Sequence, residues 1–97
     1  MPQFEWDPSK ARRNLAKHGV AFEDAALVWD DPLYLLRFDR HEGGEERWHA
    51  IGRAGGVVVL VVWHATPDPE QPERVRIIGA RKATPRERTA YEQQADA

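Results

Sequence analysis

The 97-residue sequence contains no cysteine, one serine and no long hydrophobic run. The lack of cysteine excludes disulfide bonds, a thiolate nucleophile, and zinc or iron–sulfur sites built on cysteine. The single serine, Ser9, does not follow a strand at a sharp turn, so a serine hydrolase is not expected. No apolar run approaches the roughly 20 residues of a membrane-spanning helix, and the N-terminal residues lack the apolar stretch of a signal peptide. We therefore expect a cytoplasmic protein that has no membrane partner.

Motifs for cofactors and metal ions are also missing. The pairs Gly43-Gly44 and Gly55-Gly56 lie in expected hairpin turns and not between a strand and a helix, so they do not form a phosphate-binding loop. No two of the four histidines are four residues apart, which is the spacing by which one helix presents two histidines to a metal. The sequence therefore predicts neither a cofactor nor a metal site.

The formal charge of −2 is small, but it is unevenly distributed. Residues 1–22 carry +2, residues 23–46 carry −6, residues 47–88 carry +4 and residues 89–97 carry −2. The overall value argues against a nucleic-acid partner, because such proteins usually have a basic excess. The separation of charge nevertheless allows the basic segments to form a basic surface on the folded chain.

Two helices are expected near the N-terminus. The first covers residues 8–18, because Asp7 suits the N-cap, Pro8 suits the first helical position and Gly19 suits the left-handed position after the end. The second covers roughly residues 22–29, where apolar side chains repeat at a spacing of three and four. Asp31-Pro32 ends it, because a residue before proline is disfavoured in helical conformation.

The rest of the chain predicts strands and one more helix. We expect strands at residues 33–38, 46–53, 57–63 and 74–81, a proline-rich loop at residues 66–72, and a helix that opens at Thr84-Pro85-Arg86-Glu87 and runs through Tyr91. The strand at 57–63 is apolar throughout, as in a central strand covered on both faces. This order predicts a single α+β domain over residues 1–97, with a mostly antiparallel sheet, two N-terminal helices and one C-terminal helix.

Cations and proton-transfer groups lie on the expected strands and helices. Arg47, Arg53, Arg76 and Arg81 lie on strands or at their ends, and the planar fork of arginine matches a phosphate. The side chains that could move protons are Glu45, Glu46, His18, His49 and Tyr91. A metal-free ribonuclease needs a base for the ribose 2′-hydroxyl, cations for the pentacoordinate phosphate and an acid for the 5′-oxygen.

These residues also have purely structural interpretations. An arginine on a strand is most often solvated or salt-bridged, and His18 could cap the carbonyls at a helix end. Glu87 has the spacing of a capping box, and Tyr91 could pack against the sheet. Taken alone, the residues support a small α+β domain that has a basic face.

Several motifs, taken in order, resemble those of a known family. They are Phe4-Glu5-Trp6-Asp7, Lys17-His18-Gly19-Val20, Glu45-Glu46-Arg47, Ile51-Gly52-Arg53 and the run from Arg76 to Thr84, followed by Glu87 and Tyr91-Glu92. The set is similar to the BrnT family, the toxin halves of bacterial BrnT/BrnA toxin–antitoxin pairs. The resemblance extends from about Phe4 to Glu92. The chain differs at Gly79, where the family usually has a serine.

The resemblance implies a RelE-like fold and an endoribonuclease that arrests growth. Such an enzyme works without a metal, through attack of the 2′-hydroxyl on the phosphate. The implied partners are RNA as substrate and a BrnA-type antitoxin that neutralises the toxin, with operator DNA contacted only through the antitoxin and a toxin dimer possible within the complex. An alternative function that involves no catalysis is that of a binding module for a DNA-binding, antitoxin-like protein. A plain RNA-binding domain is a third.

The family's functional positions transfer to this sequence residue by residue. The expected catalytic residues are His18, Glu46, Arg47, Arg76, Arg81 and Tyr91. In this scheme the three arginines hold the scissile phosphate, and His18, Glu46 or Tyr91 transfer protons. Lys10, Lys17, Arg53 and Lys82 are expected to contact the RNA backbone.

Overall fold

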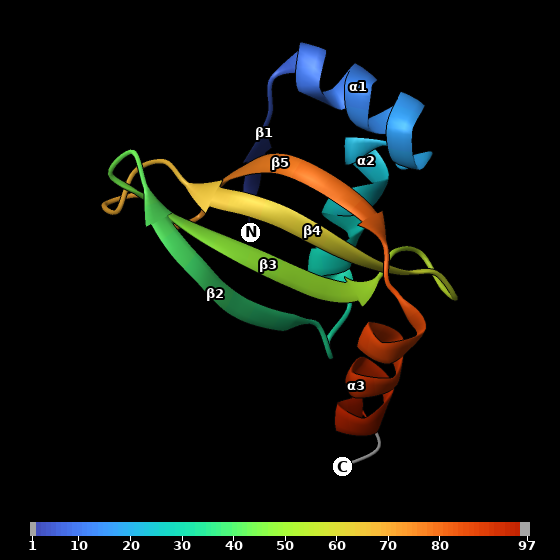
Figure 1. Cartoon of the computed structure of the whole chain (residues 1–97). Coiled ribbons are helices and arrows are strands. Elements are labelled where there is room, and N and C mark those ends of the chain that lie inside the picture. The colour runs from blue at the N-terminus through green and yellow to red at the C-terminus, as the bar shows by residue number, and fades with distance from the viewer. Residues whose placement is uncertain (1, 96–97) are drawn as a thin grey trace.

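The computed structural model describes residues 2–95; Met1 and residues 96–97, at the ends of the expected domain, lie outside the described residues. The elements in chain order are β1 (Gln3–Glu5), α1 (Pro8–His18), α2 (Phe22–Ala25), the 3-10 helix η1 (Ala26–Asp30), β2 (Leu35–Glu42), β3 (Glu45–Arg53), β4 (Val59–Thr66), β5 (Arg74–Lys82) and α3 (Pro85–Ala95). The five strands form one sheet in the order β1-β5-β4-β3-β2 (Figure 1). β1 pairs with β5 in parallel, and the other neighbours are antiparallel.

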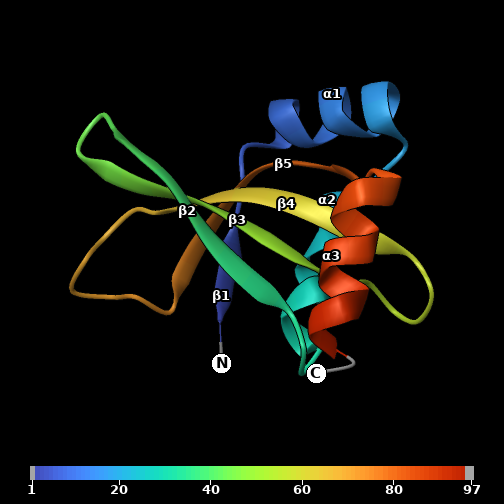
Figure 2. The ribbon, with the colours of Figure 1, turned by 60° about the horizontal axis from the view of Figure 1, so that its bottom comes forward.

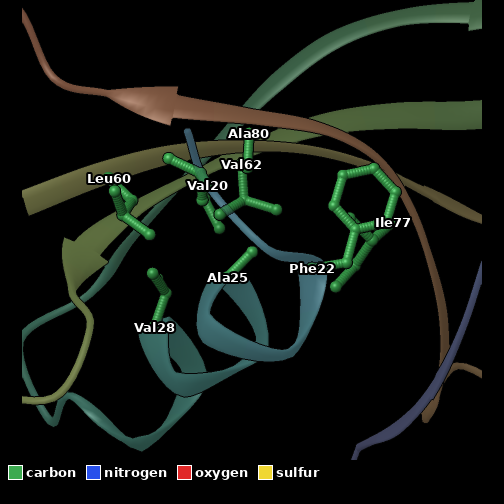
Figure 3. Packing of buried hydrophobic residues seen from close by; sticks show 9 residues of the cluster. Val20, Phe22, Ala25, Val28, Leu60, Val62, Ile77 and Ala80 are labelled. Carbon is green, nitrogen blue, oxygen red and sulfur yellow. The ribbon is translucent and has the colours of Figure 1, made fainter. Parts of the chain in front are cut away.

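The main core lies between one face of the sheet and α2 with η1. It is made of nine buried residues: Val20, Phe22, Ala25, Val28, Ala50, Leu60, Val62, Ile77 and Ala80 (Figure 3). We call this side of the sheet the helix face. Burial of these apolar side chains is the main force that holds the helical segment on the sheet.

The opposite face of the sheet is covered only in part. A smaller cluster forms where Tyr91 of α3 packs on Ile51, Val59 and Val61. These strand residues lie close to the hairpin that joins β3 to β4, so α3 covers that end of the face (Figure 2). We call this side of the sheet the open face.

Local signals define α1 as expected. The Asp7 carboxylate accepts a hydrogen bond from the Ser9 backbone N–H at 2.8 Å, and Gly19 ends the helix at φ 70°. The buried Asn14 then joins the helix to the sheet, because its side chain donates to the Val20 and Ala80 carbonyls and accepts from the Ala80 N–H. β1 pairs only with residues 74–76 of β5, so the outer edge of β5 has no neighbouring strand at Ala80. The Asn14 amide makes the two hydrogen bonds to Ala80 that such a strand would make.

Several expected boundaries were wrong. The second helix keeps α geometry for one turn and continues as the 3-10 helix η1 to Asp30. β2 starts later and runs on to Glu42, with a bulge between Phe38 and Arg40. Val57 lies outside β4 and is 75% exposed, because the Ala54 N–H closes the hairpin loop on the Val58 carbonyl. The three residues of β1 were not expected to form a strand.

The α+β class, the mostly antiparallel sheet, the N-terminal helices and the C-terminal helix are confirmed. β4 is the central strand, and its residues 59–62 are buried, as its apolar sequence predicts. The capping box is also present: Glu87 accepts from the Thr84 N–H at 2.8 Å, and the Glu87 N–H donates to the Thr84 hydroxyl at 3.2 Å. None of the helices within residues 2–95 is long and apolar enough to cross a membrane.

Candidate active site

Strand register arranges the open face in three rows of side chains that run across β2, β3, β4 and β5. Cross-strand partners point to the same face, so each row can be read from the pairing. The rows are Arg40, Arg47, Ala65 and Arg76; then Arg37, His49, Trp63 and Gly79; then Leu35, Ile51, Val61 and Arg81. The third row extends under α3. The first two rows therefore bring arginines, a histidine and a tryptophan together beyond the part that α3 covers.

Two arginines of the first row approach the same carboxylate. Glu45 accepts a hydrogen bond from the Arg76 guanidinium, and the same oxygen lies 4.0 Å from Nη2 of Arg47. Arg47 also lies 3.9 Å from Glu42, and its Nε is buried without a hydrogen-bond partner among the described residues. Ala65 separates the two arginines in the row and adds little bulk between them. Two guanidinium groups that share one anionic oxygen form an arrangement that also suits a phosphate.

Arg81 joins the open face to the start of α3. Its guanidinium donates to both carboxylate oxygens of Glu87, at 2.7 and 3.0 Å, and lies 4.9 Å from the centre of the Trp63 ring. The hydrogen bond raises the pKa of Arg81 and lowers the pKa of Glu87 to about 2. Arg81 is thus a cation at the edge of the open face and also an anchor for α3.

The second row contains an ordered histidine. The His49 ring meets the Trp63 ring edge-on, with centres 5.0 Å apart and planes at 62°. Its Nε2 lies 3.6 Å from a carboxylate oxygen of Asp39, which comes from the bulge in β2. The aromatic contact and the carboxylate together hold the ring in one orientation.

A cavity of about 150 Å³ lies beside Arg40 and Arg47. Its lining includes Asp39, Arg47, Trp63, Ile78 and Gly79. A Cβ at Gly79 would meet only the Asn14 side-chain oxygen at 3.7 Å, an ordinary contact. The fold therefore tolerates a side chain there, and its absence widens the cavity next to the arginines.

A second depression follows the outer edge of β5 along α1. It measures about 330 Å³, and Asn14 and Ile78 form part of its lining. The rest of the lining consists of four basic side chains: Lys10, Arg13, Lys17 and His18. Ile78 is the bulged residue of β5 and lines both cavities. The cations of α1 therefore continue the basic surface of the open face around the edge of the sheet.

Other expected site residues lie apart from the arginine rows. Strand alternation places Glu46 on the helix face, where it lines a cavity with Trp48 and His64, and it is Glu45 that reaches the arginines. Lys82 also lies on the helix side, beside Val20 and Asp24. Neither side chain joins the cluster on the open face.

Tyr91 and Arg53 belong to the covered end of the open face. Tyr91 is 1% exposed, and its hydroxyl donates to Asp31. Burial and this hydrogen bond raise the pKa of Tyr91 to about 12, so its hydroxyl stays protonated and engaged at neutral pH. The Arg53 guanidinium lies 5.6 Å from the centre of the Tyr91 ring. This arrangement gives Tyr91 a clear structural role.

Some side chains of the cluster were not expected there. Arg37 and Arg40 are three residues apart, so strict alternation would separate them, and the bulge at Asp39 brings both to the open face. Trp63, which was expected only as part of the apolar central strand, also lies on the open face. His49, in contrast, shares the strand alternation of Arg47, and that pattern was sufficient to place it on the same face.

No cluster of three or more His, Asp or Glu side chains suited to a metal ion occurs within residues 2–95. Arginine is the predominant charged residue of the first two rows. These arginines can bind an anion, and His49 in the same rows can transfer a proton.

Comparisons with known proteins identify the fold and the family of this chain. No curated protein matches the chain. Among solved structures, the crystal structure of the Brucella abortus ribonuclease toxin BrnT superposes with a TM-score of 0.62 at 23% identity, covering 87% of this chain and 99% of that one. This likeness shows a shared fold. The family model described as the ribonuclease toxin BrnT of type II toxin–antitoxin systems matches residues 6–87. The chain therefore belongs to the BrnT family of ribonuclease toxins of type II toxin–antitoxin systems.

Proposed function

We propose that this toxin cleaves RNA on the open face, without a metal ion, through attack of the ribose 2′-hydroxyl on the adjacent phosphate. The observation that carries the proposal is the approach of Arg47 and Arg76 to one carboxylate oxygen of Glu45, together with the cavity that Arg47 lines. A phosphate oxygen has the charge and geometry to replace that carboxylate oxygen.

The arginines stabilise the charge that develops during the reaction. Arg47 and Arg76 donate to the non-bridging oxygens of the scissile phosphate, which gain negative charge as the phosphorus becomes pentacoordinate. Arg81 approaches from the α3 side, over the Trp63 ring. All three guanidinium groups are held in position by carboxylates or by an aromatic ring before the substrate arrives.

The basic depression beside α1 continues the path of the RNA. Lys10, Lys17 and His18 line it, and Ile78 connects it to the cavity among the arginines. In this proposal these side chains bind backbone phosphates on one side of the cleavage position. Arg53 and Lys82 lie off this path, and His18 acts in binding instead of proton transfer.

A type II toxin implies a cognate antitoxin as well as an RNA substrate. We propose that a BrnA-type antitoxin neutralises this chain by covering the arginines of the open face with its own carboxylates, as Glu45 and Glu87 already do within the chain. Contact with operator DNA would then be made by the antitoxin.

Expression of the toxin alone and with its cognate antitoxin tests the proposal. The toxin alone should arrest growth and leave RNA with 2′,3′-cyclic phosphate or 3′-phosphate ends and 5′-hydroxyl ends, and the antitoxin should abolish both effects. Products that carry 5′-phosphate, or cleavage by the purified toxin that stops when a chelator is added, would contradict the mechanism. Normal growth together with a tight antitoxin complex would favour a non-enzymatic binding module.

A further inference from the structure

His49 occupies the middle of the open face. It lies in the second row between Arg37 and Trp63, and it follows Arg47 by two residues on the same side of β3. Its side chain is 25% exposed, so the ring is accessible but held by its neighbours. A substrate phosphate bound by Arg47 would place the adjacent ribose within the neighbourhood of this ring.

The two ring nitrogens of His49 have different surroundings. Nε2 is shielded from solvent, faces Asp39 at 3.6 Å and makes no hydrogen bond within residues 2–95. The carboxylate favours the tautomer in which Nε2 carries the proton. That tautomer leaves Nδ1 as the unprotonated nitrogen, available to accept a proton from a ligand.

The other candidates for proton transfer are placed less well. Glu46 points to the helix face, and the Tyr91 hydroxyl is buried against Asp31. Glu45 does reach the open face, but its carboxylate is engaged by Arg76 and Arg47. His49 is the member of this set that combines access, orientation and proximity to the phosphate-binding arginines.

We propose that His49 is the general base of the cleavage reaction and that Asp39 is its positioning residue; this rests on the function proposed above. Nδ1 of His49 takes the proton of the 2′-hydroxyl as the 2′-oxygen forms a bond to phosphorus. The bond between phosphorus and the 5′-oxygen breaks, and the 5′-oxygen takes a proton from water. Asp39 stabilises the imidazolium that forms, which then returns its proton to solvent.

Purified His49→Ala and His49→Gln variants test the catalytic assignment on a short RNA that contains one cleavable phosphate. General-base catalysis contributes about 10²- to 10⁴-fold, so both variants should lose that factor in kcat with little change in KM. Added imidazole should restore part of the rate of His49→Ala, because it enters the space of the missing ring. His41→Ala is the matched control: His41 is 71% exposed on the β2–β3 hairpin and should cut at the wild-type rate.

The Asp39→Asn variant tests the positioning role. It should lower kcat by about tenfold or more in the wild-type background and have no further effect in His49→Ala, because both changes remove the same step. Additive losses in the double variant would show that Asp39 acts independently of His49 and would overturn its assignment.

The outcomes separate this proposal from the proposed function. If folded His49 variants cut at the wild-type rate while Arg76→Ala does not cut, His49 is not the base but the site stands. If the His49 variants lose cleavage without rescue by imidazole, or lose RNA binding, the role is structural and the assignment is overturned. If the wild type does not cut RNA, or if Arg76→Ala cuts normally, the proposed function itself fails.

Discussion

Glu45 binds Arg76 on the open face, and through the same oxygen it approaches Arg47, so the free site already contains an anion of its own. This carboxylate holds the two guanidinium groups in position. It also occupies the position that a phosphate oxygen would take. Binding of RNA must therefore displace or share it.

Replacement of Glu45 by Gln should strengthen RNA binding. The amide keeps the size of the side chain but removes the negative charge that competes with phosphate, and we expect about three- to tenfold tighter binding at low salt. Fluorescence anisotropy with an RNA that has a 2′-deoxy residue at the cleavage position measures this without turnover. Glu46→Gln is the matched control, because the neighbouring side chain points to the helix face. Weaker or unchanged binding by Glu45→Gln would argue against phosphate binding at this position.

Tyr91→Phe should lower stability and leave cleavage intact. The change removes the hydroxyl that donates to Asp31, a residue that also accepts from the Arg53 N–H at 2.8 Å and the Leu33 N–H at 2.9 Å. Loss of one hydrogen bond to a charged group costs about 1.5–3 kcal/mol. Urea unfolding and cleavage assays on the same preparation separate the two effects. A large loss of kcat with unchanged stability would restore the catalytic role that the family resemblance implies.

Asn14→Ala should weaken the attachment of α1 to the sheet. The substitution removes three hydrogen bonds and leaves the N–H and C=O of Ala80 without their partners in the interior. The free energy of unfolding should fall by about 2–4 kcal/mol. Arg12→Ala, on the exposed side of the same helix, should have little effect. Equal stability of the two variants in urea unfolding would contradict the role of Asn14.

His64 predicts a loss of stability in mild acid. This side chain is 5% exposed, its ring lies edge-on to Trp29 at 4.9 Å, and neither ring nitrogen has a hydrogen-bond partner within the described residues. Burial, with a smaller contribution from His49, lowers the pKa of His64 from 6.5 to about 4. Between pH 6.5 and pH 4 the unfolded chain binds the proton and the folded chain does not, so stability is complete above pH 6.5 and falls as the pH decreases.

The His64→Leu variant isolates this effect. It should be at least as stable as the wild type at pH 7, because it removes two buried polar atoms that lack partners. Between pH 6.5 and pH 4 the wild type should lose roughly 1 kcal/mol per pH unit more than the variant. Urea unfolding at pH 7, 6 and 5 provides the comparison. Parallel losses in both proteins would show that another group causes the acid sensitivity.

Capping residues in the sequence were sufficient to predict where the helices α1 and α3 begin and where α1 ends. Asp7 and Gly19 delimit α1, and the reciprocal hydrogen bonds of Thr84 and Glu87 open α3. β1 could not be recognised in this way, because its three residues become a strand only by pairing with β5, about 70 residues later in the chain. Contacts between distant segments carry no local pattern.

For the site, local alternation predicts which face of a strand a side chain occupies, but the ends of strands and the bulges depend on pairing with other strands. Alternation along β3 is sufficient to place Arg47 and His49 on one face, and it also places Glu45 there, but the expected strand began at residue 46 and left Glu45 out. The family resemblance favoured Glu46, whereas the contact to the arginines belongs to Glu45. The bulge at Asp39 depends on the pairing of β2 with β3, and it determines that Arg40 joins the open face.

The central claim is that Arg47 and Arg76 hold the phosphate that is cleaved. The most direct measurement is the rate at which three purified proteins cleave one RNA in the presence of a chelator. They are the wild type, the double variant Arg47→Ala/Arg76→Ala and the control Arg12→Ala/Arg86→Ala. The control loses the same number of positive charges, but at two exposed positions. The account predicts 2′,3′-cyclic phosphate and 5′-hydroxyl ends from the wild type and the control, and a rate at least about 10²-fold lower from a folded Arg47→Ala/Arg76→Ala variant. Cleavage by that variant at the rate of the control would contradict the account.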